Sequence, residues 1–269
     1  MKTQILGLLA ETSIHPGAGQ SSGVVDLPVA REAATDYPVV PGSSLKGALL
    51  GLARSRALPS IERIFGQQEN AGQLLVSDAR LLLLPVRSLH TASKWVTCPH
   101  LLERFTRDSH RAGDAAAALG ATVEQGKYLG SCADALFLEE RQFTSAGPLP
   151  NGLVETLSKL IPHKQTRDRL AAQLIVLHDD DFAWFARHGL AVQARNVLGK
   201  EKTSENLWYE ETIPPDALFY TLLAERQNGA LDAIAGLFKD HPYLQAGGNE
   251  TVGMGWFAVT WPAEKGGAT

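Results

Sequence analysis

An early apolar segment followed by a very long polar loop limits the possible folds of this chain more than any other feature. Residues 4–12 have the apolar character and the length of a buried strand. From Ser13 to about Val40 the chain is polar and rich in glycine. Loops longer than about 12–15 residues are uncommon in compact domains and are usually functional or disordered. The pattern therefore predicts a functional segment beside the first strand.

The segment after this loop is predicted to be an amphipathic helix. The residues Pro-Gly-Ser-Ser at 41–44 supply a turn and an N-cap. Apolar residues then recur at the spacing of one helical face, at Leu45, Ala48, Leu49, Leu52 and Ala53. Gly47 and Gly51 weaken this helix, so we expect a close neighbour against them.

Strands and helices alternate through the rest of the chain. We expect strands over 73–84 (stopped by Pro85), 134–139, 172–178, 190–195, 217–224 and 255–261, and helices over 99–111, 151–161, 180–188 and 229–239. The polar stretch 196–216 is interpreted as a hairpin-like excursion. This alternation, with its long excursions, favours an α+β ferredoxin-like core with insertions over a doubly wound sheet. No convincing linker divides the chain, so one domain is expected.

Charge and cysteine content exclude several classes of protein. The 269 residues carry 25 basic and 29 acidic side chains, a net charge of −4, which argues against a generic free-standing nucleic-acid binder but allows a local basic groove. Cys98 and Cys132 form no C-x-x-C motif, so a cysteine zinc site is disfavoured and a reducing setting is favoured. The apolar run at 5–10 is too short to span a bilayer. We therefore expect a cytoplasmic protein with no membrane partner.

The start of the predicted helix offers groups that suit a phosphate. Residues 42–47 have the G-x-x-x-x-G frame of a P-loop, but Ala48 stands where that loop needs lysine, so nucleotide hydrolysis is disfavoured. Ser43, Ser44 and Lys46 still provide hydroxyls and a cation at a helix N-terminus. The alternative is a plain helix cap with a solvated lysine, which these residues alone favour.

A second glycine-rich element runs from residue 245 to residue 256. Four glycines in nine residues allow the backbone to approach a ligand closely. The G-x-G-x-x-G fingerprint is absent, so dinucleotide binding is disfavoured. A tight hairpin before the last strand is the simpler interpretation. Two glycine-rich elements suited to phosphate binding in one chain favour a long polyanion as ligand.

Several acidic and histidine residues are candidates for proton transfer or metal binding. His15 and Asp26 lie in the long loop beside glycines, although their spacing alone favours two ordinary loop residues. Glu210 and Glu211 end an aromatic-acidic stretch that we expect to be an exposed tip, where an ordinary surface acidic pair is the alternative. The acids of the His-Asp-Asp-Asp run at 178–181 are predicted to cap a helix rather than to bind metal.

The combined motifs resemble the backbone RAMP subunit of the type III-B CRISPR effector complex, the Cmr subunit four family. The resemblance begins with His-Pro-Gly-Ala-Gly-Gln at 15–20 and Val-Asp-Leu-Pro at 25–28. It continues through Arg-Glu at 31–32, Pro-Val-Val-Pro-Gly-Ser-Ser-Leu-Lys-Gly at 38–47, Ile-Phe-Gly at 64–66, residues 75–80, 85–88 and 207–214, and the glycine-rich stretch 245–256. It spans nearly the whole chain.

The resemblance implies a fold and a biological role. The fold would be α+β, a ferredoxin-like (RRM-like) RAMP palm in a single domain, 1–269, with a finger-like insertion at about 85–130 and a thumb-like hairpin at about 190–216. Copies would stack along a CRISPR guide RNA together with other subunits of the complex. Each copy would cut the paired target RNA once, so cuts would recur at regular intervals.

Site residues carry over by the same resemblance. Asp26 would be the residue most closely tied to cleavage and would bind the required divalent metal, Mg or Mn. His15, Glu210 and Glu211 would assist. Contacts to the guide backbone would come from Ser43, Ser44, Lys46, Gly247, Gly248 and Asn249, with Arg54 or Arg56 in place of an arginine that relatives carry earlier in the helix.

The implied chemistry is attack of an RNA 2′-OH on the adjacent phosphate, which leaves a cyclic phosphate and a free 5′-OH. DNA lacks this hydroxyl and should be bound but not cut. Two alternatives stay open: a purely structural guide-binding subunit, and a stand-alone RAMP endonuclease that matures precursor CRISPR RNA without metal. If Asp26 waits for target, residues 14–36 should be partly mobile in a free subunit, whereas a rigid, buried, salt-bridged Asp26 would count against catalysis.

Overall fold

The computed structural model describes residues 1–21, 23–114, 119–131 and 135–261. Cys132 and the first residue of the strand expected over 134–139 lie outside these ranges. The helices and strands, in chain order, are β1 (Thr3–Ala10), β2 (Val39–Val40), α1 (Gly42–Ser55), α2 (Ile61–Phe65), β3 (Gly66–Gln67), β4 (Asn70–Ala71), β5 (Leu74–Val76), β6 (Ala79–Arg87), β7 (Ser93–Thr97), α3 (Pro99–Arg111), β8 (Lys127–Gly130), β9 (Ala135–Leu138), β10 (Arg141–Gly147), α4 (Leu153–Ser158), α5 (Lys164–Gln173), β11 (Leu174–Leu177), α6 (Asp179–His188), β12 (Ala191–Leu198), β13 (Ser204–Thr212), β14 (Leu218–Glu225), α7 (Ala230–Leu237), β15 (Tyr243–Gln245), the 3-10 turn η1 (Glu250–Val252) and β16 (Trp256–Thr260).

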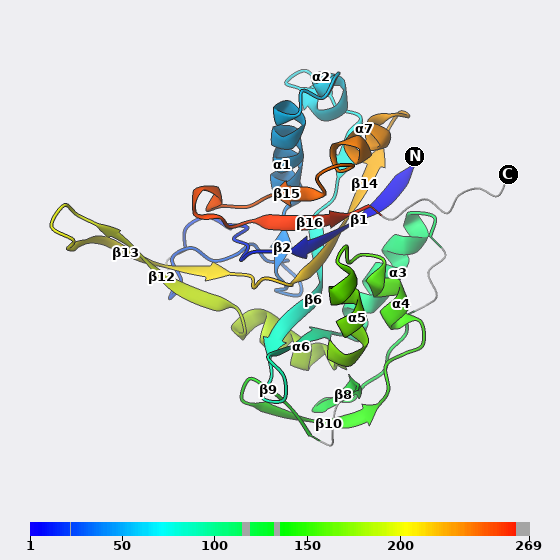
Figure 1. Cartoon of the computed structure of the whole chain (residues 1–269), viewed down its shortest axis with the longest axis vertical. Coiled ribbons are helices and arrows are strands. Elements are labelled where there is room, and N and C mark those ends of the chain that lie inside the picture. The colour runs from blue at the N-terminus through cyan, green and yellow to red at the C-terminus, as the bar shows by residue number, and fades with distance from the viewer. Residues whose placement is uncertain (22, 115–118, 132–134, 262–269) are drawn as a thin grey trace.

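Four central strands form the palm of the molecule. They lie in the order β16-β1-β14-β6, and each is antiparallel to its neighbour. The chain passes from β1 to β6 by way of α1, and from β14 to β16 by way of α7 (Figure 1). This is the strand order of a ferredoxin-like β-α-β-β-α-β unit. The predicted α+β class with a ferredoxin-like core is therefore confirmed.

The same sheet continues beyond β6 through β7, β11, β8, β10 and β9. All of these strands, with α3 to α6 and the β12–β13 hairpin, belong to the span between β6 and β14. Both segments expected as insertions, about 85–130 and about 190–216, fall largely within this span. The large insertion therefore extends the palm sheet while leaving its central order intact.

Both faces of the sheet are buried, which explains why β1 is apolar throughout. Successive strand side chains point to opposite faces. Leu6 and Leu8 join the core cluster that includes side chains of α1, α6 and α7. Ile5 and Leu9 join the second cluster, which includes side chains of α3, α4 and α5. No helix within the described ranges has the length and apolar character needed to cross a membrane.

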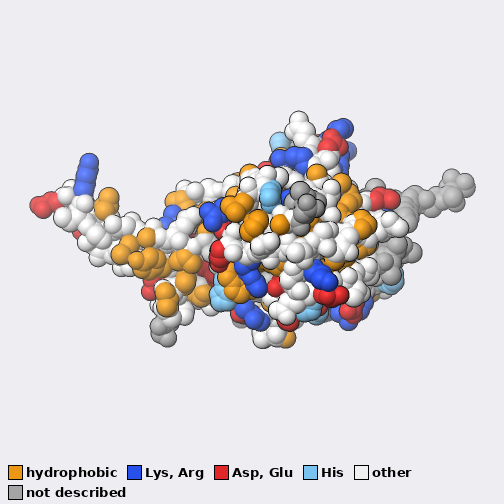
Figure 2. Space-filling model, turned by 90° about the horizontal axis from the view of Figure 1, so that it is seen from below, with side chains coloured by type: hydrophobic (Ala, Val, Ile, Leu, Met, Phe, Trp, Pro, Cys, Tyr) orange, Lys and Arg blue, Asp and Glu red, His pale blue; other side chains and the backbone are white. Residues whose placement is uncertain are grey.

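The hairpin β12–β13 projects from this body as a separate two-stranded sheet (Figure 1). Its strands pair from Ala191 opposite Thr212 to Val197 opposite Asn206, where the predicted excursion lies. Most of its residues are exposed, and hydrophobic side chains gather along the projecting arm (Figure 2). Those on its two strands that are large and exposed are Val192, Val197, Leu198, Leu207 and Tyr209.

Helix α1 forms as predicted, but two details of the prediction are wrong. A Cβ added at Gly47 or Gly51 would meet nothing within 4 Å, so neither glycine lies against a close neighbour in this structure. No side chain of residues 41–44 caps the helix; instead the amide of Gly42 donates to Asp78 Oδ1, 2.7 Å away. The cap comes from the turn between β5 and β6, far from the helix in sequence.

Pro85 does not end its strand, contrary to the prediction. Strand β6 continues to Arg87, and Pro85 lies opposite Trp95 of β7. Within the described strands, the ladder of β6 with β14 ends at Leu83, so Pro85 has a partner strand on one side only. A proline is tolerated there because its missing N–H breaks no ladder on the other side.

The acids of the 178–181 run lie in the first turn of α6, as predicted, but the N-cap itself differs from the prediction. The N-cap is His178, whose Nδ1 accepts from the amide of Asp180 at 3.2 Å. Asp181 is fully buried, where it accepts from the amide of Gly126 at 2.8 Å and pairs with Arg141 at 3.3 Å. This acid holds the β10 side of the fold to α6 and does not serve as a cap.

Candidate functional site

One edge of β13 organises the candidate site. The strand pairs with β12 on one edge, and the long first loop returns to its other edge twice. The amide of Leu27 donates to Tyr209 O at 3.1 Å, and the amide of Glu211 donates to Leu27 O at 3.0 Å. Further along, Ile14 and Ile213 exchange two bonds of 2.9 Å each. The first loop is thus joined to the base of the hairpin by main-chain hydrogen bonds.

The two predicted loop candidates, His15 and Asp26, meet at this edge. The amide of Tyr209 donates to Asp26 Oδ2 at 2.7 Å, and His15 Nδ1 lies 2.8 Å from Glu211 O. A carbonyl oxygen only accepts, so Nδ1 carries the hydrogen. In the neutral ring, Nε2 is then the proton acceptor. Tyr209 and Glu211 are two residues apart, about 7 Å along a strand, so both groups dock on one short stretch of β13.

Asp26 is the least constrained carboxylate of the site. It is partly buried, and within the described residues it makes no ion pair. Its Oδ2 accepts from the Tyr209 amide, and no hydrogen bond from a described residue occupies Oδ1. The arrangement that would count against catalysis, a buried and salt-bridged Asp26, is therefore not what the structure has. The mobility of residues 14–36 stays a prediction.

Glu211 is a buried clamp. Its Oε1 lies 2.6 Å from Arg31 Nη2, and its Oε2 accepts from the amide of Val29 at 3.0 Å. Arg31 also donates through Nη1 to Asp36 O at 2.9 Å and to Ala186 O at 2.7 Å. One guanidinium thus joins the first loop, α6 and β13.

Glu210 is buried on the other side of the strand, with 1% of its surface exposed. Its Oε2 lies 3.0 Å from Arg195 Nε on β12, and its Oε1 accepts from the side-chain amide of Asn249. His15 Nδ1 is 3.5 Å from the same Oε1. The expectation of an exposed tip or surface acidic pair is wrong for both glutamates, because each is buried with partners that compensate its charge.

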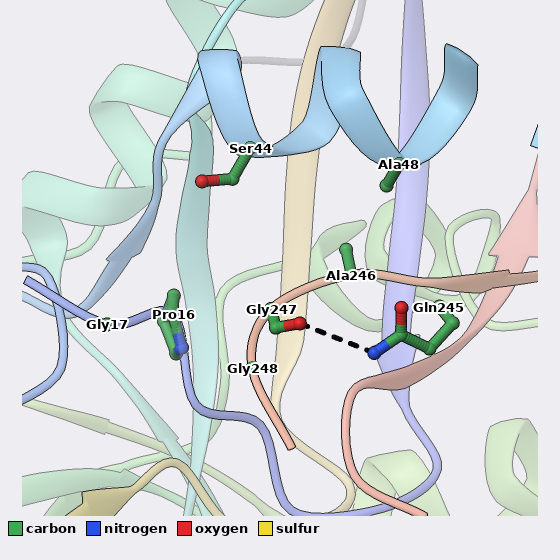
Figure 3. Close-up of a pocket in the computed structure, with 8 residues that line it drawn as sticks. All are labelled: Pro16, Gly17, Ser44, Ala48, Gln245, Ala246, Gly247 and Gly248. Atoms are coloured by element: carbon green, nitrogen blue, oxygen red, sulfur yellow. Dashed lines mark hydrogen bonds between the residues drawn. The ribbon is translucent and has the colours of Figure 1, made fainter. Parts of the chain in front are cut away.

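The glycine-rich element packs directly on the first loop. The amide of Gly248 donates to His15 O at 2.8 Å. Gly247 has φ +97°, and a Cβ there would lie 2.9 Å from His15 O, so only glycine fits. The element also borders a cavity of about 260 Å³, which Pro16 and Gly17 of the first loop line as well and which Ser44 and Ala48 of α1 face (Figure 3).

The predicted RNA contacts do not all lie at one place. Ser44, Gly247 and Gly248 line the same cavity. Lys46 lines a different cavity, of about 380 Å³, together with Arg226 and the β3–β4 hairpin. Residues two apart on a helix face different directions, which explains why Lys46 is separated from Ser44. Two further predicted contacts, Ser43 and Arg54, are exposed on α1.

The donor set for a metal ion is small. Among the described residues, no three side chains of His, Cys, Asp or Glu gather to hold an ion. Both oxygens of Glu210 and Glu211 are committed to other partners, whereas Asp26 Oδ1 is available. Mg²⁺ is commonly held by one or two carboxylates together with substrate phosphates. Asp26 fits that kind of site, with most ligands coming from RNA and water.

Two residues of the site carry no clear signal in the sequence. Arg31 stands out only as part of the Arg-Glu motif at 31–32, and Arg195 belongs to no motif. Their partners lie 180 and 15 residues away in the chain. If Glu210 and Glu211 are taken to be buried, each carboxylate needs a compensating cation, and this need is the signal that points to the two arginines.

Comparison with known proteins gives consistent matches. Residues 8–258 match the RAMP superfamily. The CRISPR system Cmr endoribonuclease Cmr4 of Pyrococcus furiosus is 33% identical, over 97% of this chain and 96% of the relative. The crystal structure of oligomeric Cmr4 from Pyrococcus furiosus superposes with a TM-score of 0.75 at 28% identity, over 98% of this chain and 100% of that one. A chain of the type III-B Cmr-beta complex bound to cognate target RNA gives 0.77 at 22% identity over 97% of both chains, which supports the fold alone.

Proposed function

We propose, from the premise that this chain belongs to the RAMP superfamily and within it to the Cmr4 family, that it is the backbone subunit of a type III-B CRISPR ribonucleoprotein. In this role it binds guide RNA and cleaves complementary target RNA at regular intervals. Its partners are the guide, the target, further copies of itself and other Cmr subunits, and its setting is the cytoplasm. The observation that carries the proposal is the docking of Asp26 and His15 side by side on the outer edge of β13.

Guide binding is assigned to the cavity between α1 and the glycine-rich element. Gly247 and Gly248 bring bare backbone to its wall, and Ser44 adds a hydroxyl (Figure 3). Such groups hold a phosphodiester backbone without reading bases. Sequence choice is then left to base pairing between guide and target. Ser43, Lys46, Arg54 and Asn249 were the remaining predicted contacts, and the first three lie on the exposed or cavity-lining surface of α1.

The cleavage step uses the ribose of the target itself. The 2′-oxygen forms a bond to the adjacent phosphorus, the bond from phosphorus to the 5′-oxygen breaks, and the products are a cyclic phosphate and a 5′-OH. The 2′-OH must lose a proton. His15 Nε2 is available to accept it, and Asp26 Oδ1 can either accept it or hold the metal ion. The leaving 5′-oxygen must gain one. The protein positions these groups on one strand edge so that the scissile linkage can lie between them.

Metal dependence is part of the proposal. Asp26 is the residue that would hold a Mg or Mn ion. A divalent ion held there would supply charge stabilisation for the phosphate oxygens in the transition state. Chelation of divalent ions is expected to stop cleavage, and added Mg²⁺ or Mn²⁺ to restore it.

The deciding experiment compares two aspartates of the same loop in assembled complexes. Asp26→Asn should slow cleavage of a complementary RNA by about a hundredfold or more while guide binding is retained. Asp36→Asn is the matched control, because Asp36 is exposed and its φ of +63° suits asparagine. Unchanged cut products with Asp26→Asn would reject the assigned role and favour a purely structural subunit. Metal-free cutting of a repeat hairpin by the lone chain would favour the maturation enzyme.

A further inference from the structure

The glycine-rich element has two faces that serve different neighbours. One face borders the cavity shared with Ser44, which the proposed function assigns to the guide (Figure 3). The other face lies on His15, through the Gly248 amide and the close approach of Gly247. Gly247 and Gly248 therefore contact both the cavity and His15, and Pro16 and Gly17, which follow His15, line the same cavity.

Asn249 directs its side chain to the inner face. Its amide nitrogen donates to Glu210 Oε1, although the resemblance predicts an RNA contact at this position. The residue has φ +63°, a left-handed conformation that asparagine tolerates better than most residues. Arg195 occupies the second oxygen of Glu210 at 3.0 Å. The carboxylate is thus held at both oxygens, one by the hairpin and one by the glycine-rich element.

Glu210 in turn lies against the imidazole of His15. The distance from Oε1 to Nδ1 is 3.5 Å, and the same Nδ1 bonds Glu211 O at 2.8 Å. Together these two acceptors keep the hydrogen on Nδ1 and leave Nε2 as the acceptor for substrate. A buried carboxylate that moved or lost a donor would shift the ring it supports.

We propose that Asn249 is a positioning residue of the cleavage site and not a contact to RNA. Through its amide, the element that borders the guide cavity holds Glu210, and through Glu210 it holds the ring of His15. This inference rests on the proposed function and adds a role that follows from the side chain's direction.

Replacement of the amide by a carboxylate gives the sharpest test. Asn249→Asp places two carboxylates in contact, and such a pair shares one proton. At mildly acidic pH the shared proton keeps the contact, whereas at higher pH both groups ionise and repel. The cleavage rate of this variant, relative to the unmodified chain, should therefore fall as pH rises. A contact to RNA phosphate would instead weaken guide binding.

Cleavage is measured in a single turnover, in complexes assembled on guide RNA, beside the affinity for labelled guide. Asn249→Ala is expected to slow cleavage by about tenfold to a hundredfold, with guide affinity changed by less than about twofold. The double variant Asn249→Asp with Glu210→Gln exchanges amide and carboxylate between the two positions. The amide at position 210 can then still donate to residue 249 and accept from Arg195, so this variant should recover part of the loss. Thr251→Ala, exposed on the same element, is the matched control.

A second measurement is independent of cutting. The ring nitrogen signals of His15 in the NMR spectrum of the full chain should change in Asn249→Ala and stay unchanged in Thr251→Ala. Unchanged ring signals, unchanged cleavage, or a loss of guide affinity as large as the loss of cleavage would each overturn the inference. An unmodified complex that binds guide but never cuts would instead reject the proposed function, and the ring signals would still decide the role of Asn249.

Discussion

Glu210 and Asp26 lie on adjoining segments, yet their carboxylates differ in burial and in how many of their oxygens are engaged. Glu210 is buried and has Arg195 and Asn249 on its two oxygens. Asp26 is partly exposed, accepts one amide and keeps an oxygen available. The contrast separates two tasks within one site. A carboxylate whose oxygens are all engaged builds the site, and one with an oxygen to spare can act on a substrate.

The contrast predicts a large difference in stability between the two sites. Glu210→Ala leaves Arg195 and Asn249 without their acceptor in a buried place, so the free energy of unfolding should fall by about 3 kcal/mol. Asp26→Ala removes one hydrogen bond near the surface and should cost about 1 kcal/mol or less. Chemical denaturation of both variants measures the difference. Equal losses would show that the two carboxylates are not divided in this way.

A substitution in the glycine-rich element tests whether close backbone packing is needed to hold the residues around Glu210 in place. Gly247→Ala forces a side chain into a left-handed conformation and against His15 O, so the free energy of unfolding should fall by about 2–3 kcal/mol. Gly47→Ala is the control, because a Cβ there meets nothing within 4 Å and alanine favours a helix by about 1 kcal/mol. Thermal unfolding should move in opposite directions for the two variants. Similar shifts would argue against a packed contact at Gly247.

Glu32 is a further carboxylate with engaged oxygens, and the stability that it contributes should depend on pH. Burial acts to raise the pKa of this carboxyl, but hydrogen bonds from Arg104 and Thr35 outweigh it and hold the pKa below its ordinary value of 4.5. A lowered folded pKa contributes stability above the unfolded pKa, and this contribution is lost as pH falls through the folded value. Glu32→Gln should therefore cost about 1–2 kcal/mol at neutral pH, and the difference should vanish in acid. A constant difference across the pH range would contradict this assignment.

Local patterns in the sequence were sufficient for the elements that local chemistry determines. The apolar spacing from Leu45 to Ala53 predicted α1, and the helix expected over 99–111 is α3 with the same bounds. The alternation of strands and helices favoured a ferredoxin-like core, and the structure supplies its strand order. The short strands β8 and β10 and the helix α5 were missed, because four to ten residues of mixed polarity give no clear period.

Long-range pairing could not be predicted in the same way. The sequence placed His15, Asp26 and the glycine-rich element among the candidates, and the structure brings the first and last into direct contact. The sequence alone could not predict that Glu210 is buried, because a carboxylate next to aromatic residues and near two prolines is typical of a surface turn. The burial of the two glutamates depends on Arg31 and Arg195, which compensate their charges and which the local sequence does not place beside them.

The attachment of the first loop to the base of β13 has a mechanical consequence. Tyr209 contributes its backbone to Asp26, while the same strand runs outward into the projecting arm. If the arm tilts at its root, the carboxylate of Asp26 must move with it, because it is bonded to the backbone of the same strand. Under the proposed function, the positions of the cuts along the target RNA are then set by the geometry of the protein and not by the base sequence.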